Sequence, residues 1–412
     1  MERIVERCCG LDVGQKTVAA CVRIAAPDGG RQQVIRMFGT MTEDLLALRD
    51  WLAAHGVTQV AMESTGVYWK AVYYLLEDAF TVLLVNAQHM KNVPGRKTDV
   101  RDCAWIAELL EHGLLRGSFV PPAPIRELRD LTRYRKTQIQ ERVREVNRLH
   151  KVLEDAGVKL AVVASDVLGV SGRAMLEALL RGTTDPKVLA ELSRGKLRKK
   201  IPELRRALEG RFATHHRFLV GRILAHLNYL DEAIEECGQQ IEELLRPFAE
   251  VVERLKSIPG VQQRTAEVIV AEIGVDMSRF PTAAHLASWA GMCPGNNESG
   301  GKRKSASTRK GNKWLRMALI ESGQAAARTI DTALSARHRR IMRHRGYQRA
   351  VVAVGHEILV ISHTLIARAT TYQELGPAYF DRRQAERSIR RCVRTLERLG
   401  HKVTIEPLAP AA

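Results

Sequence analysis

The chain has 412 residues, 45% of them hydrophobic and 27% charged, which is ordinary for a globular protein of two to four domains. Its charge is not ordinary, because 64 Lys and Arg against 46 Asp and Glu give a formal net charge of +18. This surplus indicates a polyanionic partner, with nucleic acid as the leading candidate. We find no signal peptide, no run of 18 apolar residues and no zinc-ligand spacing, and the odd count of seven cysteines is typical of reduced thiols. We therefore expect a cytoplasmic protein without a membrane partner.

Residues 1–124 predict an α/β domain with a mixed sheet. Apolar and alternating patterns predict two strands within 7–25, joined by a tight turn at Gly14-Gln15, and further strands at 33–38, 57–63 and 81–87. Amphipathic patterns predict helices at 42–56, 69–79 and 99–112, with Thr42 as the N-cap of the first. The Pro-rich segment 120–124 ends the domain.

Four acids in this domain are candidates for a metal site. Asp12 interrupts an apolar strand, where a carboxylate is costly unless it is paired or bound to metal, and Glu63 ends another apolar strand. Asp99 and Asp102 lie one turn apart at the start of a helix, where acids also gain about 0.3–1 kcal/mol from the helix dipole. If the strands are adjacent in a ribonuclease-H-type sheet, the four carboxylates converge and predict Mg²⁺ or Mn²⁺, as two ions.

The rest of the chain predicts long helices. Apolar periodicity over 128–157 and 218–245 predicts an antiparallel coiled-coil arm within 125–250. Residues 251–370 predict a helical domain, and 371–412 a basic helix and tail. Within the helical domain, "SIPGVQQRTAEVIVAEIG" resembles a helix-hairpin-helix whose Gly260 turn exposes backbone N–H groups to a phosphate. A plain helical hairpin remains the alternative.

Basic segments indicate where nucleic acid binds. Residues 302–316 contain seven Lys and Arg and no acid, which favours contact with phosphates. Further basic segments are 126–151, 194–217 and 337–349. The cations that we expect to contact nucleic acid are Lys97, Lys302, Arg303, Lys304, Arg309, Lys310 and Lys313. Aromatic residues make up only 5% of the chain, so base stacking is not expected to be the dominant mode.

The motifs "GLDVGQKT", "MESTGVYW" and "KTDVRDCAWIAELL", in this order, resemble the four-acid (Asp-Glu-Asp-Asp) transposases of bacterial insertion sequences. That family is related to the Piv DNA invertase and is known for bridge-RNA-guided recombinases. The resemblance implies a RuvC-like, ribonuclease-H-fold domain at 1–124, with the four acids at Asp12, Glu63, Asp99 and Asp102. It also implies double-stranded DNA and a structured guide RNA as partners, and a dimer that assembles into a tetramer.

A second resemblance concerns Ser299, which the sequence places in an exposed polar loop. From spacing alone, a Ser-Gly pair in a loop is a turn. The segment "AGMCPGNNESGGKRK", however, resembles the family's segment whose serine is the recombination nucleophile, and this places that role on Ser299. Many relatives have an Arg soon after the segment's Pro, where this chain has Gly295-Asn296-Asn297. Lys302 or Arg303 is therefore expected to assist the scissile phosphate instead.

We predict a transposase that cuts and rejoins DNA through a serine–DNA intermediate, assisted by metal-bound acids. Two alternatives stay open: a metal-dependent, junction-resolvase-like endonuclease in which water attacks and Ser299 is incidental, and a non-catalytic nucleic-acid-binding scaffold. "LDVGQKT" also suits the first phosphate loop of actin-like sugar kinases and ATPases. That fold needs a second D-x-G-x-[ST] loop, which the sequence lacks.

Overall fold

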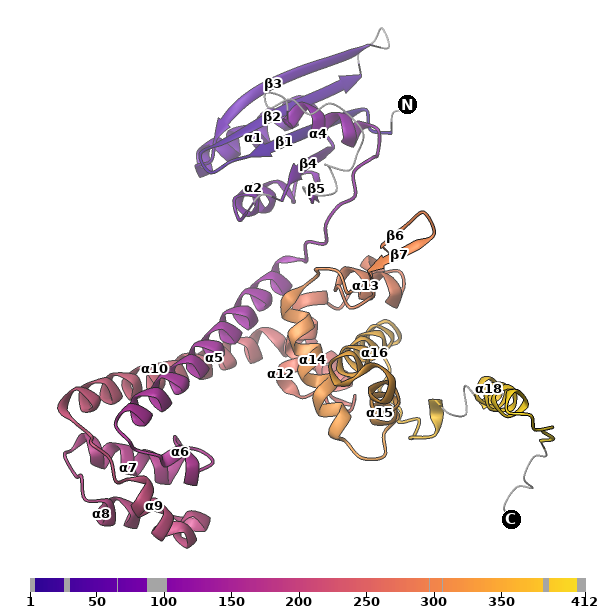
Figure 1. Ribbon diagram of the computed structural model, residues 1–412. Helices are drawn as coiled ribbons and strands as arrows, with labels where there is room; N and C mark the ends of the chain where they lie inside the picture. The colour runs from indigo at the N-terminus through magenta and orange to yellow at the C-terminus, as the bar shows by residue number, and fades with distance from the viewer. Residues whose placement is uncertain are drawn as a thin grey trace. The chain divides into compact units, whose positions relative to one another are not determined.

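The computed structural model describes residues 4–25, 30–64, 66–86, 102–295, 297–305, 307–380 and 385–405. The chain divides into two compact units, Met1–Val120 and Pro121–Ala412 (Figure 1).

The first unit contains a five-stranded mixed sheet in the order β3-β2-β1-β4-β5. The strands are β1 (Arg7–Val13), β2 (Thr17–Ala25), β3 (Arg31–Gly39), β4 (Gln59–Glu63) and β5 (Thr81–Val85). β1, β2 and β3 pair antiparallel, whereas β1 with β4 and β4 with β5 pair parallel. The helices are α1 (Thr42–Ala54), α2 (Trp69–Leu76) and α4 (Asp102–Glu111). The predicted α/β domain with a mixed sheet is thus confirmed.

Residues of β1 alternate between the two faces of the sheet. Cys9 and Leu11 pack with leucines of α1 and with α2 on one face. Cys8 packs with Ile106 of α4 on the other face. One detail of the prediction was wrong: Met41, not Thr42, is the N-cap of α1, and it makes no side-chain capping hydrogen bond. Thr42 is already the first helical residue.

The second unit begins with two long helices, α5 (Ala123–Asp155) and α10 (Thr214–Leu245), which pack against each other. The apolar seam predicted for α5 is not continuous, because Val143 is 54% exposed. Polar residues, among them Thr132, Arg135 and Glu145, are buried on α5 instead. The coiled-coil register therefore stays a prediction.

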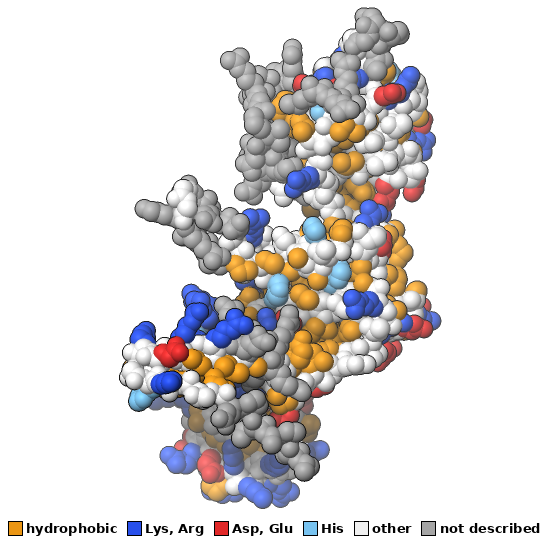
Figure 2. Space-filling view, turned by 90° about the vertical axis from the view of Figure 1, so that its right-hand side faces the viewer, with side chains coloured by type: hydrophobic (Ala, Val, Ile, Leu, Met, Phe, Trp, Pro, Cys, Tyr) orange, Lys and Arg blue, Asp and Glu red, His pale blue; other side chains and the backbone are white. Residues whose placement is uncertain are grey.

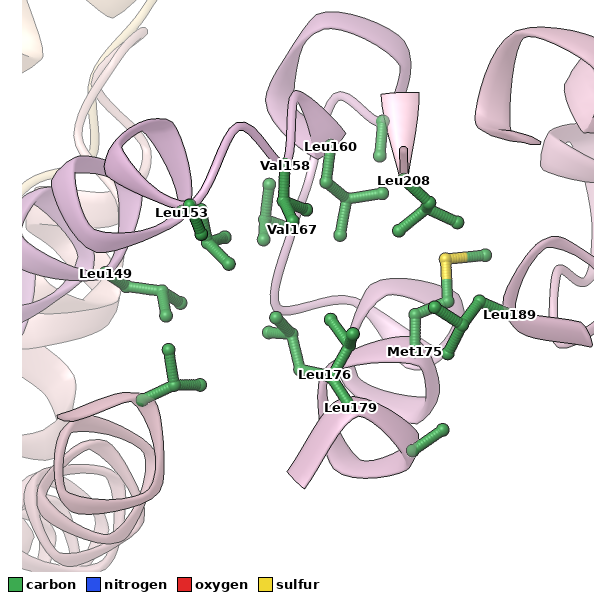
Figure 3. Close-up of a cluster of buried hydrophobic side chains, with 14 of the residues drawn as sticks. Leu149, Leu153, Val158, Leu160, Val167, Met175, Leu176, Leu179, Leu189 and Leu208 are labelled. Carbon is green, nitrogen blue, oxygen red and sulfur yellow. The ribbon is translucent and has the colours of Figure 1, made fainter. Parts of the chain in front are cut away.

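Between these helices the chain forms a small bundle, which we call the tip bundle. Its elements are α6 (Leu160–Val163), α7 (Val170–Leu180), α8 (Pro186–Glu191), η1 (Gly195–Lys200) and α9 (Ile201–Ala207). Leu149 and Leu153 from the end of α5 point into the same apolar core as Leu176 and Leu179 of α7 (Figure 3). The core also includes Val220 and Leu224 of α10. Both long helices are therefore fixed to the tip bundle by buried apolar contacts.

The remaining elements follow in the chain and are mostly helices. They are η2 (Arg246–Phe248), α11 (Ala249–Lys256), α12 (Gln263–Ile273), η3 (Met277–Arg279), α13 (Ala283–Trp289), β6 (Asn297–Ser299), β7 (Lys302–Ser305), α14 (Lys313–Arg328), α15 (Ala333–Arg345), α16 (Tyr347–Arg368) and α18 (Ala385–Arg398). Among the described residues, α16 alone is long and apolar enough to cross a membrane by length and composition, and half of its apolar stretch is buried. It packs against α13, α14 and α15, as a core helix does.

Candidate functional site

Two of the predicted metal-binding acids lie side by side at one end of the sheet. In the parallel pairing of β1 with β4, Leu11 is opposite Met62, and Asp12 and Glu63 are the next residues on the two strands. Neighbouring strands lie about 4.8 Å apart, and residues in register project from the same face. Asp12 is exposed and Glu63 is half-buried. The register therefore brings these two carboxylates together.

The helix α4 covers the same face of the sheet and begins at Asp102, another of the four predicted acids. Gly10, which projects from the same face as Asp12, lies so close to α4 that a Cβ there would be 2.2 Å from the Cys103 carbonyl oxygen and 2.4 Å from the Ala107 nitrogen. Asp102 is the first residue of α4 and is half-buried. Asp12 and Glu63 thus lie at the carboxyl ends of β1 and β4, and α4 packs on the same face of the sheet. The carboxylates of Asp12, Glu63 and Asp102 are not all within 4.8 Å of one another.

The charge of the Asp12 carboxylate also affects the pKa of the Cys103 thiol. A hydrogen bond with the Cys21 thiol lowers the pKa of Cys103, burial opposes that shift, and the negative charge of Asp12 opposes it further. The Asp12 carboxylate therefore acts electrostatically on the first turn of α4. Two other predicted site residues, Lys97 and Asp99, lie outside the described residues.

Replacing Gly10 by alanine is expected to displace the start of α4. The added methyl would overlap backbone atoms of Cys103 and Ala107, which cannot rotate away, so a cost of about 1–3 kcal/mol is expected. Thermal unfolding should occur at a lower temperature, and titration with Mn²⁺ should show weaker binding. Gly14→Ala is the control, since its Cβ would meet only the Thr17 oxygen at 3.3 Å. Equal unfolding temperatures for the wild type and Gly10→Ala would contradict the close packing.

Ser299 lies in a β-hairpin, so the predicted flexible loop was wrong. β6 and β7 pair antiparallel, with Ser299 opposite Lys302, and Gly300 and Gly301 form the two-residue turn. Both glycines have positive φ, 59° and 72°, as a type I′ turn requires. Two glycines between short polar strands are a hairpin signal in the sequence, and this signal was missed. The backbone of Ser299 therefore sits at the last strand position before a tight turn.

The base of this hairpin is held by close backbone contacts. The Gly295 nitrogen donates to the Ser307 oxygen at 2.8 Å. The Arg316 guanidinium donates to the Gly291 oxygen at 3.0 Å and to the Thr308 hydroxyl at 2.7 Å. Gly311 has no room for a side chain, because a Cβ would lie 2.4 Å from the Gly291 nitrogen. The hairpin thus projects from a fixed base.

A buried carboxylate that the sequence did not point to links this base to α5. Glu272 at the end of α12 is fully buried, and Arg133 of α5 binds both of its carboxylate oxygens, at 2.7 and 2.8 Å. The Asn312 side-chain amide donates to the same carboxylate at 2.6 Å. The Asn312 side-chain oxygen in turn accepts from the Trp314 and Leu315 nitrogens, capping α14. One anion therefore joins α5, α12 and the segment that follows the hairpin.

The turn at Gly260 joins α11 to α12. Gly260 has φ +86°, and a Cβ there would lie 2.5 Å from the Ser322 oxygen of α14. Close packing on α14 thus accounts for the glycine in this turn. The predicted phosphate contact of this turn stays a prediction.

The structure describes only some of the cations that are expected to contact nucleic acid. Arg309, Lys310 and Lys313 are exposed. Lys302, Arg303 and Lys304 lie on β7, and only their backbone is described. On the face drawn in Figure 2, Lys and Arg side chains form several groups, and Asp and Glu side chains are fewer.

Another donor cluster lies where α5 and α10 meet the tip bundle. Within the described part of the chain, Asp155, His215 and His216 alone form a group of three donors within 4.8 Å of one another. His216 Nδ1 accepts from the Ala213 nitrogen at 3.1 Å, and its Nε2 lies 2.9 Å from an Asp155 oxygen. Because Nδ1 accepts, Nε2 carries the proton in the neutral ring and donates to Asp155. His216 is thus a capping residue with both nitrogens engaged, which is unfavourable for a metal ligand.

Comparisons with known proteins agree on a family. One family model, described as a transposase, matches residues 9–157, and a second, described as a transposase of the IS116/IS110/IS902 family, matches residues 252–339. The chain is 25% identical over 335 residues to a probable family 20 transposase of Pseudomonas aeruginosa, covering 79% of this chain and 89% of that protein.

Two further relatives match shorter parts. An uncharacterized 44.8 kDa protein of insertion element IS116 from Streptomyces clavuligerus is 31% identical over 254 residues, which are 53% of this chain and 61% of that protein. The pilin gene-inverting protein of Moraxella bovis is 27% identical over 147 residues, covering 34% and 45% of the two chains. The two family matches cover both the domain of the acids and the flanks of the serine hairpin. The chain is therefore an insertion-sequence transposase of the IS110/IS116 family.

Proposed function

We propose that this transposase cuts and rejoins DNA strands through Ser299, with a divalent cation site formed by Asp12, Glu63, Asp99 and Asp102. The observation that supports the proposal is the register that puts Asp12 next to Glu63 at the ends of β1 and β4, beside α4, which begins at Asp102. Carboxylates gathered in this way repel one another, and hard oxygen donors of this kind fit Mg²⁺ or Mn²⁺. When bound, such ions, two in the proposal, supply positive charge to the reacting phosphate oxygens.

In the serine step, one bond to phosphorus forms, one breaks, and one proton is transferred. A bond forms between Ser299 Oγ and phosphorus, the bond from phosphorus to the deoxyribose oxygen breaks, and the serine proton ends on the departing oxygen. The strand is then held as a phosphoserine ester, which keeps the phosphodiester energy for rejoining. Lys302, opposite Ser299 in the hairpin, and Arg303 are the proposed cationic partners of the scissile phosphate.

Incubation with nicked or bridged DNA and Mg²⁺ tests this function. We expect a protein–DNA adduct that survives denaturation and is lost when the metal is chelated. Asp12→Asn should weaken Mn²⁺ binding at least tenfold, on the order of the effect of changes around metal ligands. Asp50→Asn is the matched control, because Asp50 is an exposed acid of α1 in the same unit.

The competing function is a metal-dependent nuclease in which water attacks. It is favoured by the fact that the three described acids all belong to the first unit, whereas Ser299 belongs to the second. Hydrolysed DNA ends without an adduct would support it and would exclude the serine step. Unchanged nucleic-acid binding in Asp12→Asn, with no cleaved or joined DNA from the wild type or the variant, would instead support a non-catalytic scaffold.

A structured guide RNA and a dimer that assembles into a tetramer complete the proposal. The net charge of +18 supports extensive contact with phosphates. Sequencing of RNA that co-purifies with the protein should return one structured species. Light scattering of the nucleic-acid complex should show more than one protomer, and a monomeric complex would contradict the assembly.

A further inference from the structure

A cavity of about 330 Å³ opens where α5, α12 and α14 meet within the second unit (Figure 1). This volume is at the lower end of the range of about 300–1,000 Å³ that small-molecule sites occupy. Its apolar wall is formed by Ile139, Val268, Ala318 and Trp314. No described residue of β6 or β7 lines it, so it is a different site from the serine hairpin.

The rim of this cavity is cationic, and one of its cations has no partner. Arg133 binds Glu272, Arg135 binds Glu267, and Lys136 binds Glu321 at 2.6 Å. Arg264, at the start of α12, is exposed, and within the described residues its side chain makes no hydrogen bond or ion pair. The rim therefore offers a guanidinium that forms no ion pair with a described residue, although Arg264 also lines a neighbouring pocket with Glu235, Glu242, Glu253 and Glu267.

Trp314 provides an aromatic surface in the wall. The Trp314 backbone nitrogen donates to the Asn312 side-chain oxygen at 3.1 Å, and the Asn312 side-chain amide donates to the buried Glu272 carboxylate. The Lys313 ammonium lies over the indole ring, 4.8 Å from its centroid. The cap fixes the backbone at Trp314, and the half-buried indole lines the cavity as an aromatic surface for stacking.

We propose that this cavity binds one unstacked nucleobase of a nucleic-acid strand, with the base against Trp314 and a flanking phosphate at Arg264. A flat aromatic ligand with an adjacent negative charge matches the apolar wall and the free guanidinium together. An apolar side chain of a second protein would fill the wall but leave the Arg264 charge uncompensated, so the charge favours a nucleotide. The same chemistry could come from DNA or from RNA.

The first experiment uses adenosine 5′-monophosphate as the minimal probe, with adenosine and ribose 5-phosphate for comparison. We expect the complete nucleotide to bind more tightly than either fragment. Trp314→Ala should weaken this binding by about five- to hundred-fold, the effect of losing one stacked base. Trp314→Phe should restore most of the binding, because it keeps an aromatic ring.

The second experiment identifies the strand, using duplexes that carry a single bulged 2-aminopurine in DNA or in RNA. Stacking on Trp314 should quench the fluorescence of the bulged base in one of the two, and a paired 2-aminopurine should show no such effect. Arg264→Ala should weaken binding and reduce the slope of affinity against salt by about one. Controls are Tyr134→Ala, an exposed aromatic of α5 that does not line the cavity, and Arg279→Ala, an exposed cation elsewhere in the unit.

Two results would overturn the nucleobase site. One is ribose 5-phosphate binding as tightly as the nucleotide, which would leave a phosphate contact only. The other is bulged and paired duplexes responding identically to Trp314→Ala. Because neither experiment requires strand cleavage, a protein without serine chemistry could still pass both.

Discussion

Ser299→Ala is expected to abolish the denaturation-resistant protein–DNA adduct and to lower strand joining on the order of 10⁴-fold or more, as removal of a catalytic nucleophile does. The change removes a hydroxyl at the end of β6 and leaves the backbone pairing of the hairpin intact. Loss of activity in this variant can therefore be assigned to chemistry and not to folding. The measurement is denaturing electrophoresis of labelled DNA after incubation with the protein and Mg²⁺.

Ser305→Ala is the matched control for this experiment. Ser305 ends β7 and is opposite Asn297, so it belongs to the same hairpin but to the other strand. It should form the adduct as the wild type does. An adduct that persists in Ser299→Ala, or is lost equally in Ser305→Ala, would show that Ser299 is not the nucleophile.

Glu272→Ala is expected to destabilise the helical unit by about 3–5 kcal/mol, the usual cost of removing one partner of a buried ion pair. Glu272 is fully buried and accepts from Arg133 and from Asn312. Its loss leaves a guanidinium without this counter-charge and the N-cap of α14 without its anchor. Urea unfolding followed by the helical circular dichroism signal should show a lower midpoint.

Glu321→Ala is the control for this experiment. The Glu321 side chain is 59% exposed, and its ion pair with Lys136 joins α5 to α14. Exposed pairs contribute about 0–1 kcal/mol, so a small shift is expected. Equal shifts for Glu272→Ala and Glu321→Ala would mean that burial does not set the strength of this contact.

Local patterns predicted the first unit well because its key contacts follow from strand order. Asp12 and Glu63 each follow a short apolar run, and parallel pairing of the two strands is enough to bring them together. The turn after β1 was also predicted, and the Gly14 nitrogen donates to the Thr17 oxygen there. Where residues meet through neighbouring strands, periodicity and chain order carry the necessary information.

The second unit was harder to predict because its decisive contacts are distant in the chain. Glu272 lies in an apolar helix and looks like an isolated charge, while its partner Arg133 is 139 residues away. The predicted seam of α5 assumed that apolar residues are buried, yet Val143 is exposed and Arg135 is buried against Glu267. Pairing with α12 overrides the periodic pattern here, and no single helix shows that from its own sequence.

The continuity of α5 has a consequence for the size of any bound nucleic acid. Its 33 residues form one uninterrupted helix, about 50 Å long at 1.5 Å per residue. Arg133, ten residues from the start of α5, is fastened to α12, and Leu153 near the other end is buried in the tip bundle. The 20 residues between these two anchors span about 30 Å, equal to about nine base pairs of duplex at 3.4 Å each. A nucleic acid bound at both ends of this helix would span a fixed length between its two contacts, whatever its base sequence.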